Sequence, residues 1–65
     1  MADIFDRVDD ALANKVELFE QDGLWTVRVT EHGVVAVFSF PEMDKAVDYA
    51  ETERVRLAIA QITFL

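Results

Sequence analysis

The sequence predicts an α+β domain in which an N-terminal helix is followed by a three-stranded antiparallel β-meander and a C-terminal helix packed on the sheet. The spacing of apolar residues indicates this order, because it is helical before Lys15, has a period of two up to Phe40, and is helical again after Pro41. Two short turns that contain glycine divide the alternating part into three strands. No linker or repeat interrupts the 65 residues, so we expect residues 1–65 to form a single small domain.

The first predicted element is a short amphipathic helix over residues 3–13. Asp3 is a candidate N-cap, and Asp6 follows near the positive end of the helix dipole. A helix of about eleven residues is marginal on its own, so its apolar side must pack against the rest of the domain. That side consists of Ile4, Phe5, Val8, Ala11 and Leu12.

The meander is defined by two turn signals, Asp22-Gly23 and His32-Gly33. A tight primed turn needs positive φ angles, and glycine adopts them without steric strain. The first turn sets Leu18 opposite Val27, and the second sets Phe38 opposite Val27. One face of the meander then collects the apolar side chains that we predict to form the core. These are Val16, Leu18, Trp25, Val27, Val29, Ala36, Phe38 and Phe40.

The C-terminal helix begins after Pro41, a residue that suits the first turn of a helix. Apolar residues recur on one helical stripe between Met43 and Ala58, which predicts that the helix packs on the sheet. Its end is ambiguous, because residues 57–64 also alternate as a strand would. The competing interpretation is a strand from about Leu57 to Phe64. We expect the helix to continue to about Ala60, and a short fourth strand over 62–64 after it is a further alternative.

Few side chains of this sequence are suited to catalysis or to binding a cofactor. The chain has no cysteine and one histidine, His32, so it holds neither a nucleophile pair nor a zinc site. Both glycines lie in predicted turns, which leaves no phosphate-binding loop. Asp6, Asp9 and Asp10 are better explained as a solvated helix face than as a cation site. We therefore predict no enzyme, no catalytic residue, no cofactor and no metal, with a cation-dependent enzyme as the weakest alternative.

A second group of carboxylates lies on the C-terminal helix. Asp48, Glu51 and Glu53 stand close in the sequence to Arg54 and Arg56. Salt bridges on the helix surface explain this group better than paired acid and base catalysis.

The charge of the chain argues against nucleic acid as a partner. Six Lys and Arg residues stand against 13 Asp and Glu residues, a net charge of −7, so the chain lacks the positive field that attracts phosphate backbones. The first ten residues are acidic and no apolar run approaches the ~18 to 20 residues that span a bilayer. We expect a cytoplasmic protein without a membrane partner.

Two apolar surfaces remain beyond the predicted core. Phe19, Val35 and Val37 lie on the outer face of the sheet, where a solvated face would be polar. A further apolar stripe lies on the far side of the C-terminal helix, and the N-terminal helix can cover only one of the two surfaces. We therefore predict a protein-interaction module that self-associates, as a homodimer, or binds another protein. The candidate interface residues are Phe19, Val35, Val37, Val55, Ile59 and Ile62.

The spacing of several core and turn residues resembles short bacterial domains in which three strands precede one helix. The residues that match are Trp25, Val27, Val29, Gly33, Phe38, Pro41, Ala46, Tyr49 and Ala50, and the match covers about residues 15 to 57. The chain is similar to a group of uncharacterised small bacterial proteins and, more distantly, to the arm-type DNA-binding domain of phage integrases.

The integrase resemblance implies a sheet face that lies in the major groove of DNA. In this sequence that face corresponds to Thr26, Arg28, Thr30, Val35, Val37 and Ser39, of which only Arg28 is basic. A nucleic-acid accessory domain that uses the outer sheet face is therefore the alternative function.

Overall fold

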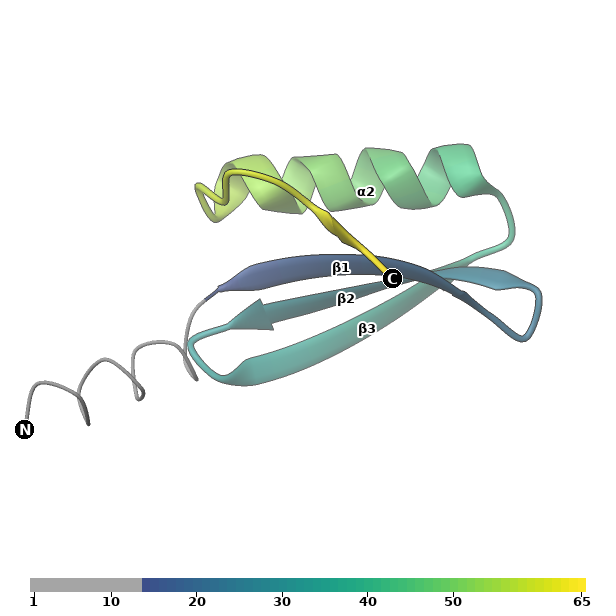
Figure 1. The fold of residues 1–65 in the computed structure, drawn as a ribbon, viewed down its shortest axis with the longest axis horizontal. Coiled ribbons are helices and arrows are strands. Elements are labelled where there is room, and N and C mark those ends of the chain that lie inside the picture. Colours follow the sequence, from purple (N-terminus) through teal and green to yellow (C-terminus); the bar gives the residue numbers. More distant parts are fainter. Residues whose placement is uncertain (1–13) are drawn as a thin grey trace, which may run out of the picture.

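A computed structural model describes residues 14–65, which form a four-stranded sheet with one helix on one of its faces (Figure 1). The elements follow the chain as β1 (Lys15–Gln21), β2 (Leu24–Glu31), β3 (Val34–Phe40), α2 (Met43–Arg56) and β4 (Thr63–Phe64). The strand order in the sheet is β3-β2-β1-β4. The first three strands pair antiparallel, and β4 pairs parallel to β1.

The α+β class is as predicted, but the predicted architecture is wrong. The described sheet has four strands and is mixed, whereas a purely antiparallel sheet of three strands was expected. The fourth strand is the alternative at 62–64, realised as Thr63–Phe64 beside β1. Two residues are too few for their alternation to be told from a helical pattern. The predicted N-terminal helix falls on residues 3–13, which lie outside the described residues.

Both predicted hairpin registers are confirmed. Leu18 pairs with Val27, and Val27 pairs in turn with Phe38. The turns have the expected backbone, because φ is 55° at Asp22 and 80° at Gly23, and 52° at His32 and 82° at Gly33. Two consecutive positive φ values define the type I′ turn, whose twist matches that of the strands it joins.

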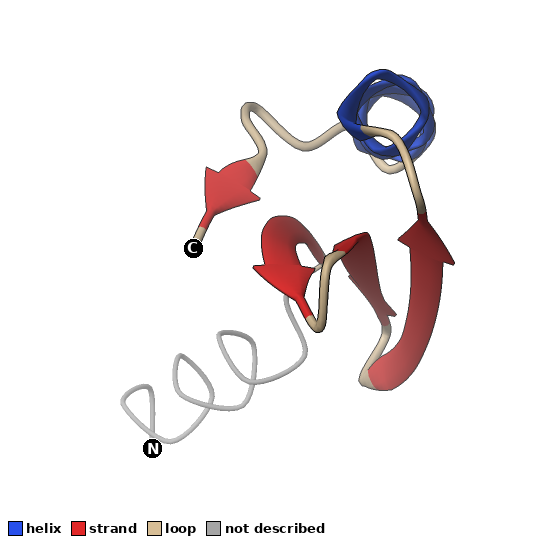
Figure 2. Cartoon of the chain, turned by 90° about the vertical axis from the view of Figure 1, so that its right-hand side faces the viewer, coloured by secondary structure: helices blue, strands red, loops and turns tan. Residues whose placement is uncertain are grey.

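The core lies between α2 and the inner face of the sheet, the face toward the helix (Figure 2). The helix contributes Ala46 and Ala50, both fully buried, and these small side chains let its backbone approach the strands closely. The sheet contributes Val16, Leu18, Val27 and Val29.

The predicted core is too wide on the β3 side. Phe38 is 40% exposed and Ala36 is only half-buried, although both were assigned to the core. The reason is that α2 lies over β1 and β2 more than over β3. Alternation along a strand identifies which face a side chain points to, but not how far the helix extends across that face.

The helix ends at Arg56, earlier than expected, through a Schellman motif. The N–H of Ile59 donates to the C=O of Arg54 at 2.9 Å, and the N–H of Ala58 donates to the C=O of Val55 at 3.1 Å. Ala58 takes the position where most such motifs have glycine, with φ at 57°. Because the sequence offers no glycine here, it gave no sign of where the helix stops.

Ala58→Gly is expected to stabilise the protein. Glycine removes the strain that a Cβ atom causes at positive φ. This gain is larger than the entropic cost of the greater freedom that glycine gives the unfolded chain, so the free energy of unfolding should rise by about 0.5 to 1 kcal/mol. Urea denaturation followed by circular dichroism measures the change. Ala60→Gly is the control, because Ala60 is exposed and is not among the positive-φ residues. A less stable A58G variant would contradict this account of the helix end.

Candidate functional site

Within the described residues, β3 is one edge strand of the sheet and the two-residue β4 is the other. Within residues 14–65 β3 pairs with β2 on one side, and no strand pairs with its other side. Its seven residues, VVAVFSF, include no charged side chain. Natural edge strands usually carry a charge, a proline or a bulge that prevents further pairing, so an uncharged edge of this length is a candidate interaction site.

Apolar side chains are exposed on both faces of β3. On the outer face, Val35 is 54% and Val37 is 56% exposed. On the inner face, Val34 is 70% exposed, and Phe38 is partly exposed although its ring contacts Tyr49 of α2. Phe38 was missed as a candidate because it was predicted to lie in the core, and Val34 was assigned neither to the core nor to an interface.

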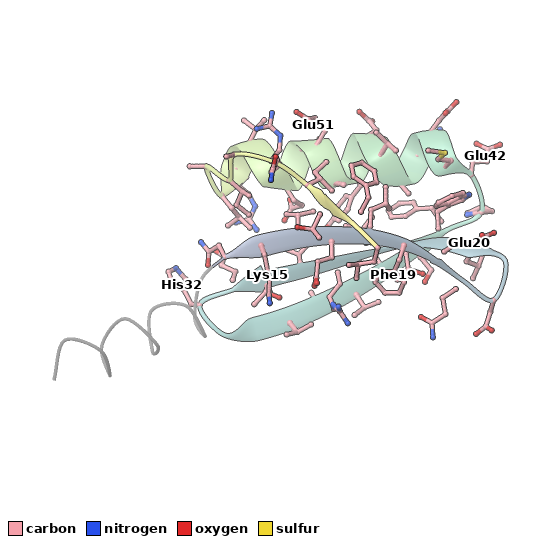
Figure 3. All side chains as sticks on the ribbon, viewed as in Figure 1. Lys15, Phe19, Glu20, His32, Glu42 and Glu51 are labelled. Atoms are coloured by element: carbon pink, nitrogen blue, oxygen red, sulfur yellow. The ribbon has the colours of Figure 1, made fainter. Side chains whose placement is uncertain are left out.

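The remaining sheet candidate, Phe19, is half-buried on β1. Its side chain lies on the side of the sheet away from α2 (Figure 3). The guanidinium of Arg28 stands 5.3 Å from the centroid of the Phe19 ring, a cation–π distance. Phe19 is therefore partly covered within the chain. Exposed apolar side chains of the sheet are most numerous on β3, and Leu24 on β2 and Phe64 on β4 are exposed as well.

The three helix candidates do not form one stripe. Val55 is exposed on α2, whereas Ile59 and Ile62 follow the end of the helix and pack against the core. The predicted stripe is wrong because it assumed that the helix continues beyond Arg56. Val55 is left as a single exposed side chain, which is common on protein surfaces.

An ion pair crosses the outer face from β1 to β2. The Arg28 Nε donates to Glu17 Oε1 at 2.7 Å, and the Glu17 side chain is only 13% exposed. This hydrogen bond, together with the positive charge of Arg28, holds the pKa of the Glu17 carboxyl below its ordinary value. Thr26 and Thr30 lie on the same face and are both buried. On the outer face of β1 and β2, the charged groups are therefore paired with each other and the threonines are buried. On the same face of β3, apolar side chains are exposed.

Acid is expected to weaken the fold partly through Glu17. Since its folded pKa is lowered, its ion pair stabilises the protein above the ordinary carboxyl value of 4.5, and this stabilisation is lost as pH falls through the lowered pKa. Glu17→Gln should therefore be less stable than the unmodified chain at pH 7, and the difference should shrink as the pH falls below 4.5. Denaturation at each pH measures it. Glu20→Gln, an exposed carboxylate on the same strand, is the control, and a pH-independent difference for E17Q would contradict the assignment.

A groove of about 480 Å³ lies between β3 and α2. Its apolar wall includes Val34, Ala36, Phe38 and Tyr49, and the Phe38 and Tyr49 rings pack with centroids 4.9 Å apart. Burial raises the pKa of the Tyr49 hydroxyl. This wall is suited to receive an apolar side chain.

Arg56 also lines the groove. Its Nη2 donates to Glu31 Oε1 on β2 at 3.0 Å and to Glu53 Oε1 on α2 at 2.7 Å. The hydrogen bond from Arg56 lowers the pKa of Glu31. Glu31 and Glu53 therefore link the helix to the sheet through one arginine.

Asp6, Asp9 and Asp10 lie outside the described residues, and the charged groups singled out on the C-terminal helix are paired at its surface. The predicted salt bridges of the helix are confirmed, since Arg54 pairs with Glu51 and Arg56 with Glu53. His32 is exposed in its turn, and its backbone N–H donates to Asn14 Oδ1 at 3.0 Å. Over residues 14–65, no three His, Cys, Asp or Glu side chains are grouped as metal ligands would be. In that same range no helix has the length and apolar character that crossing a membrane requires.

Comparison of the chain with protein-family models, with curated proteins and with solved structures finds no match. The resemblance to small bacterial domains and to integrase arm-type domains therefore stays a prediction. The exposed feature of the described residues that bears most on function is the edge strand β3.

Proposed function

We propose that the protein is a non-enzymatic protein-interaction module that self-associates as a homodimer through β3. The observation that carries this proposal is the exposure of Val34, Val35, Val37 and Phe38 along one uncharged strand. A contiguous apolar patch on a small protein marks an interaction site more often than single exposed residues do. The cysteine-free composition is compatible with a reducing compartment, and we propose a cytoplasmic location.

A second copy of this chain is the partner that fits this patch best. Over residues 14–65 the core is small, with six buried apolar side chains, and domains of this size often gain stability from association. Each chain carries a net charge of −7, so two copies repel each other wherever acidic surfaces meet. Contact through the uncharged β3 keeps those surfaces apart.

The alternative, a nucleic-acid accessory domain, has no comparable support on the outer sheet face. Arg28, the basic residue that the integrase resemblance places there, is already bonded to Glu17. Binding to phosphate backbones needs several cations that are free to replace counterions. We therefore propose a protein partner and no nucleic acid.

Charge substitution tests the proposal, with a matched control on the helix. Val37→Lys on β3 should convert a dimer at tens of micromolar into a folded monomer, because it buries a charge at the contact. Val55→Lys adds the same charge at an exposed helix position and should leave the dimer intact. Sedimentation velocity gives the mass of each variant. A monomeric V55K together with a dimeric V37K would instead place the interface on the helix and contradict the proposal.

A further inference from the structure

We propose that the dimer forms by antiparallel pairing of β3 with β3 of a second copy, about a two-fold axis at Val37. The two sheets then become one continuous sheet with both helices on the same side. This inference rests on the proposed function and specifies the contact, which is made by backbone hydrogen bonds along the edge as well as by apolar side chains.

The turn before β3 determines which backbone groups face the free edge. A two-residue type I′ turn makes its flanking residues, Glu31 and Val34, a hydrogen-bonded pair. Hydrogen-bonded and non-hydrogen-bonded pairs then alternate along an antiparallel ladder. Even-numbered residues of β3 therefore bond to β2, and the N–H and C=O groups of Val35, Val37 and Ser39 point to the free edge.

The same alternation of backbone groups holds at the opposite side of the sheet. The Asp22-Gly23 turn makes Gln21 and Leu24 a hydrogen-bonded pair, so the backbone groups of Leu18 must point away from β2. There the C=O of Leu18 accepts a hydrogen bond from the N–H of Leu65 at 3.0 Å. The C-terminal segment thus covers the β1 edge, while within residues 14–65 the equivalent groups of β3 have no strand beside them.

Only one register uses all the free groups of β3 in a symmetric pair. With the axis at Val37, Val37 faces its own copy and Val35 faces Ser39 of the second copy, and each of these pairs exchanges two backbone hydrogen bonds. An axis at Phe38 would set Val35 against Pro41, which has no N–H. An axis at Ala36 would set Ser39 against Gly33, which lies in the turn.

The side chains of β3 are complementary in this register. On the inner face, Phe38 lies opposite Ala36 of the second copy, so a large ring meets a small side chain beside the groove between β3 and α2. On the outer face, Val37 meets Val37 of the second copy. Edge pairing thereby brings apolar side chains of the two copies together on both faces of β3, whereas packing of one sheet face on another would involve only the outer side.

The ends of the paired strands bring no like charges together. His32 and Glu42 lie at opposite ends of β3 (Figure 3). In an antiparallel pair, His32 of one copy therefore comes toward Glu42 of the other. An imidazole, rather than a second carboxylate, meets each glutamate, and the strands between these ends are uncharged.

Single-cysteine variants of the full chain test the register, because the natural sequence has no cysteine. Hydrogen-bonded antiparallel pairs have Cα atoms about 5.5 Å apart, within the disulfide range. Val37→Cys should therefore form a disulfide-linked dimer on mild oxidation. Val35→Cys or Ser39→Cys alone should not, since four residues of offset separate each from its own copy by more than about 13 Å. A mixture of V35C and S39C chains should cross-link to each other.

Two substitutions at Val37 separate edge pairing from face packing. Val37→Pro removes an N–H that points to the free edge and leaves the ladder with β2 intact, so it should weaken the dimer by at least about 100-fold while the monomer stays folded. Val37→Thr keeps the branched shape and the backbone groups and should change the affinity by less than about 10-fold. Circular dichroism verifies folding, and sedimentation gives the affinities.

The outcomes distinguish this inference from the proposed function. A monomeric unmodified chain would overturn both. A dimer in which V37C fails to cross-link, or one that survives V37P and is dissociated by V37T, would overturn edge pairing alone and favour face packing. Should V37P fail to fold, the cross-linking pattern of the cysteine variants still decides the register.

Discussion

Leu18→Ala is expected to unfold a large fraction of the protein. Leu18 is 1% exposed and lies on β1 between β2 and β4, with its side chain in the core beneath α2. Truncating a buried leucine to alanine lowers the free energy of unfolding by about 2 to 5 kcal/mol, because transfer free energy is lost and a cavity is left behind. A domain of 65 residues buries a smaller share of its surface than larger domains do, so a loss of this size removes most of its stability.

Urea denaturation followed by far-ultraviolet circular dichroism measures this loss. Val55→Ala is the control, because it removes the same kind of apolar atoms from an exposed helix position and should change stability by less than about 0.5 kcal/mol. Equal and small effects of L18A and V55A would show that the core does not lie between β1 and α2.

Ala46→Asp is expected to have a comparable effect on the other side of the core. Ala46 is fully buried in the first turns of α2, where the helix contacts the sheet. An unpaired carboxylate there costs about 3 to 5 kcal/mol at neutral pH. The loss should shrink in acid, because burial raises the pKa of the new carboxyl and protonation removes the charge.

The neighbouring Lys45→Asp is the matched control for this substitution. Lys45 is exposed in the same helical turn, where an acidic side chain interacts favourably with the helix dipole. The thermal midpoint of the K45D variant should therefore stay close to that of the unmodified chain. If A46D and K45D melted at similar temperatures, α2 would not present Ala46 to the sheet.

The hairpins could be predicted from sequence because two kinds of information agreed. The turns at Asp22-Gly23 and His32-Gly33 fix the pairing, and the apolar alternation of the strands requires the same pairing. The end of α2 had no such support. Ala58 adopts positive φ without being glycine, and residues 57–64 fit a helix and a strand equally well.

The candidate site was predicted in part for a related reason. Val35 and Val37 stand out in the sequence because they are apolar on a face that should be polar. Val34 and Phe38 do not stand out, since their exposure depends on where α2 lies across the sheet. Ile59 was assigned to an exposed stripe because the early end of the helix is not visible in the sequence.

Self-association is tested most directly by the molar mass of the unmodified chain in solution. Sedimentation equilibrium over micromolar to hundreds of micromolar protein measures it without a tag or a substitution. An edge-strand interface lies at the small end of the size range for specific contacts, so we expect a reversible equilibrium. The mass should rise with concentration from 7.4 kDa toward twice that value. A constant mass of 7.4 kDa over the whole range would contradict self-association through β3.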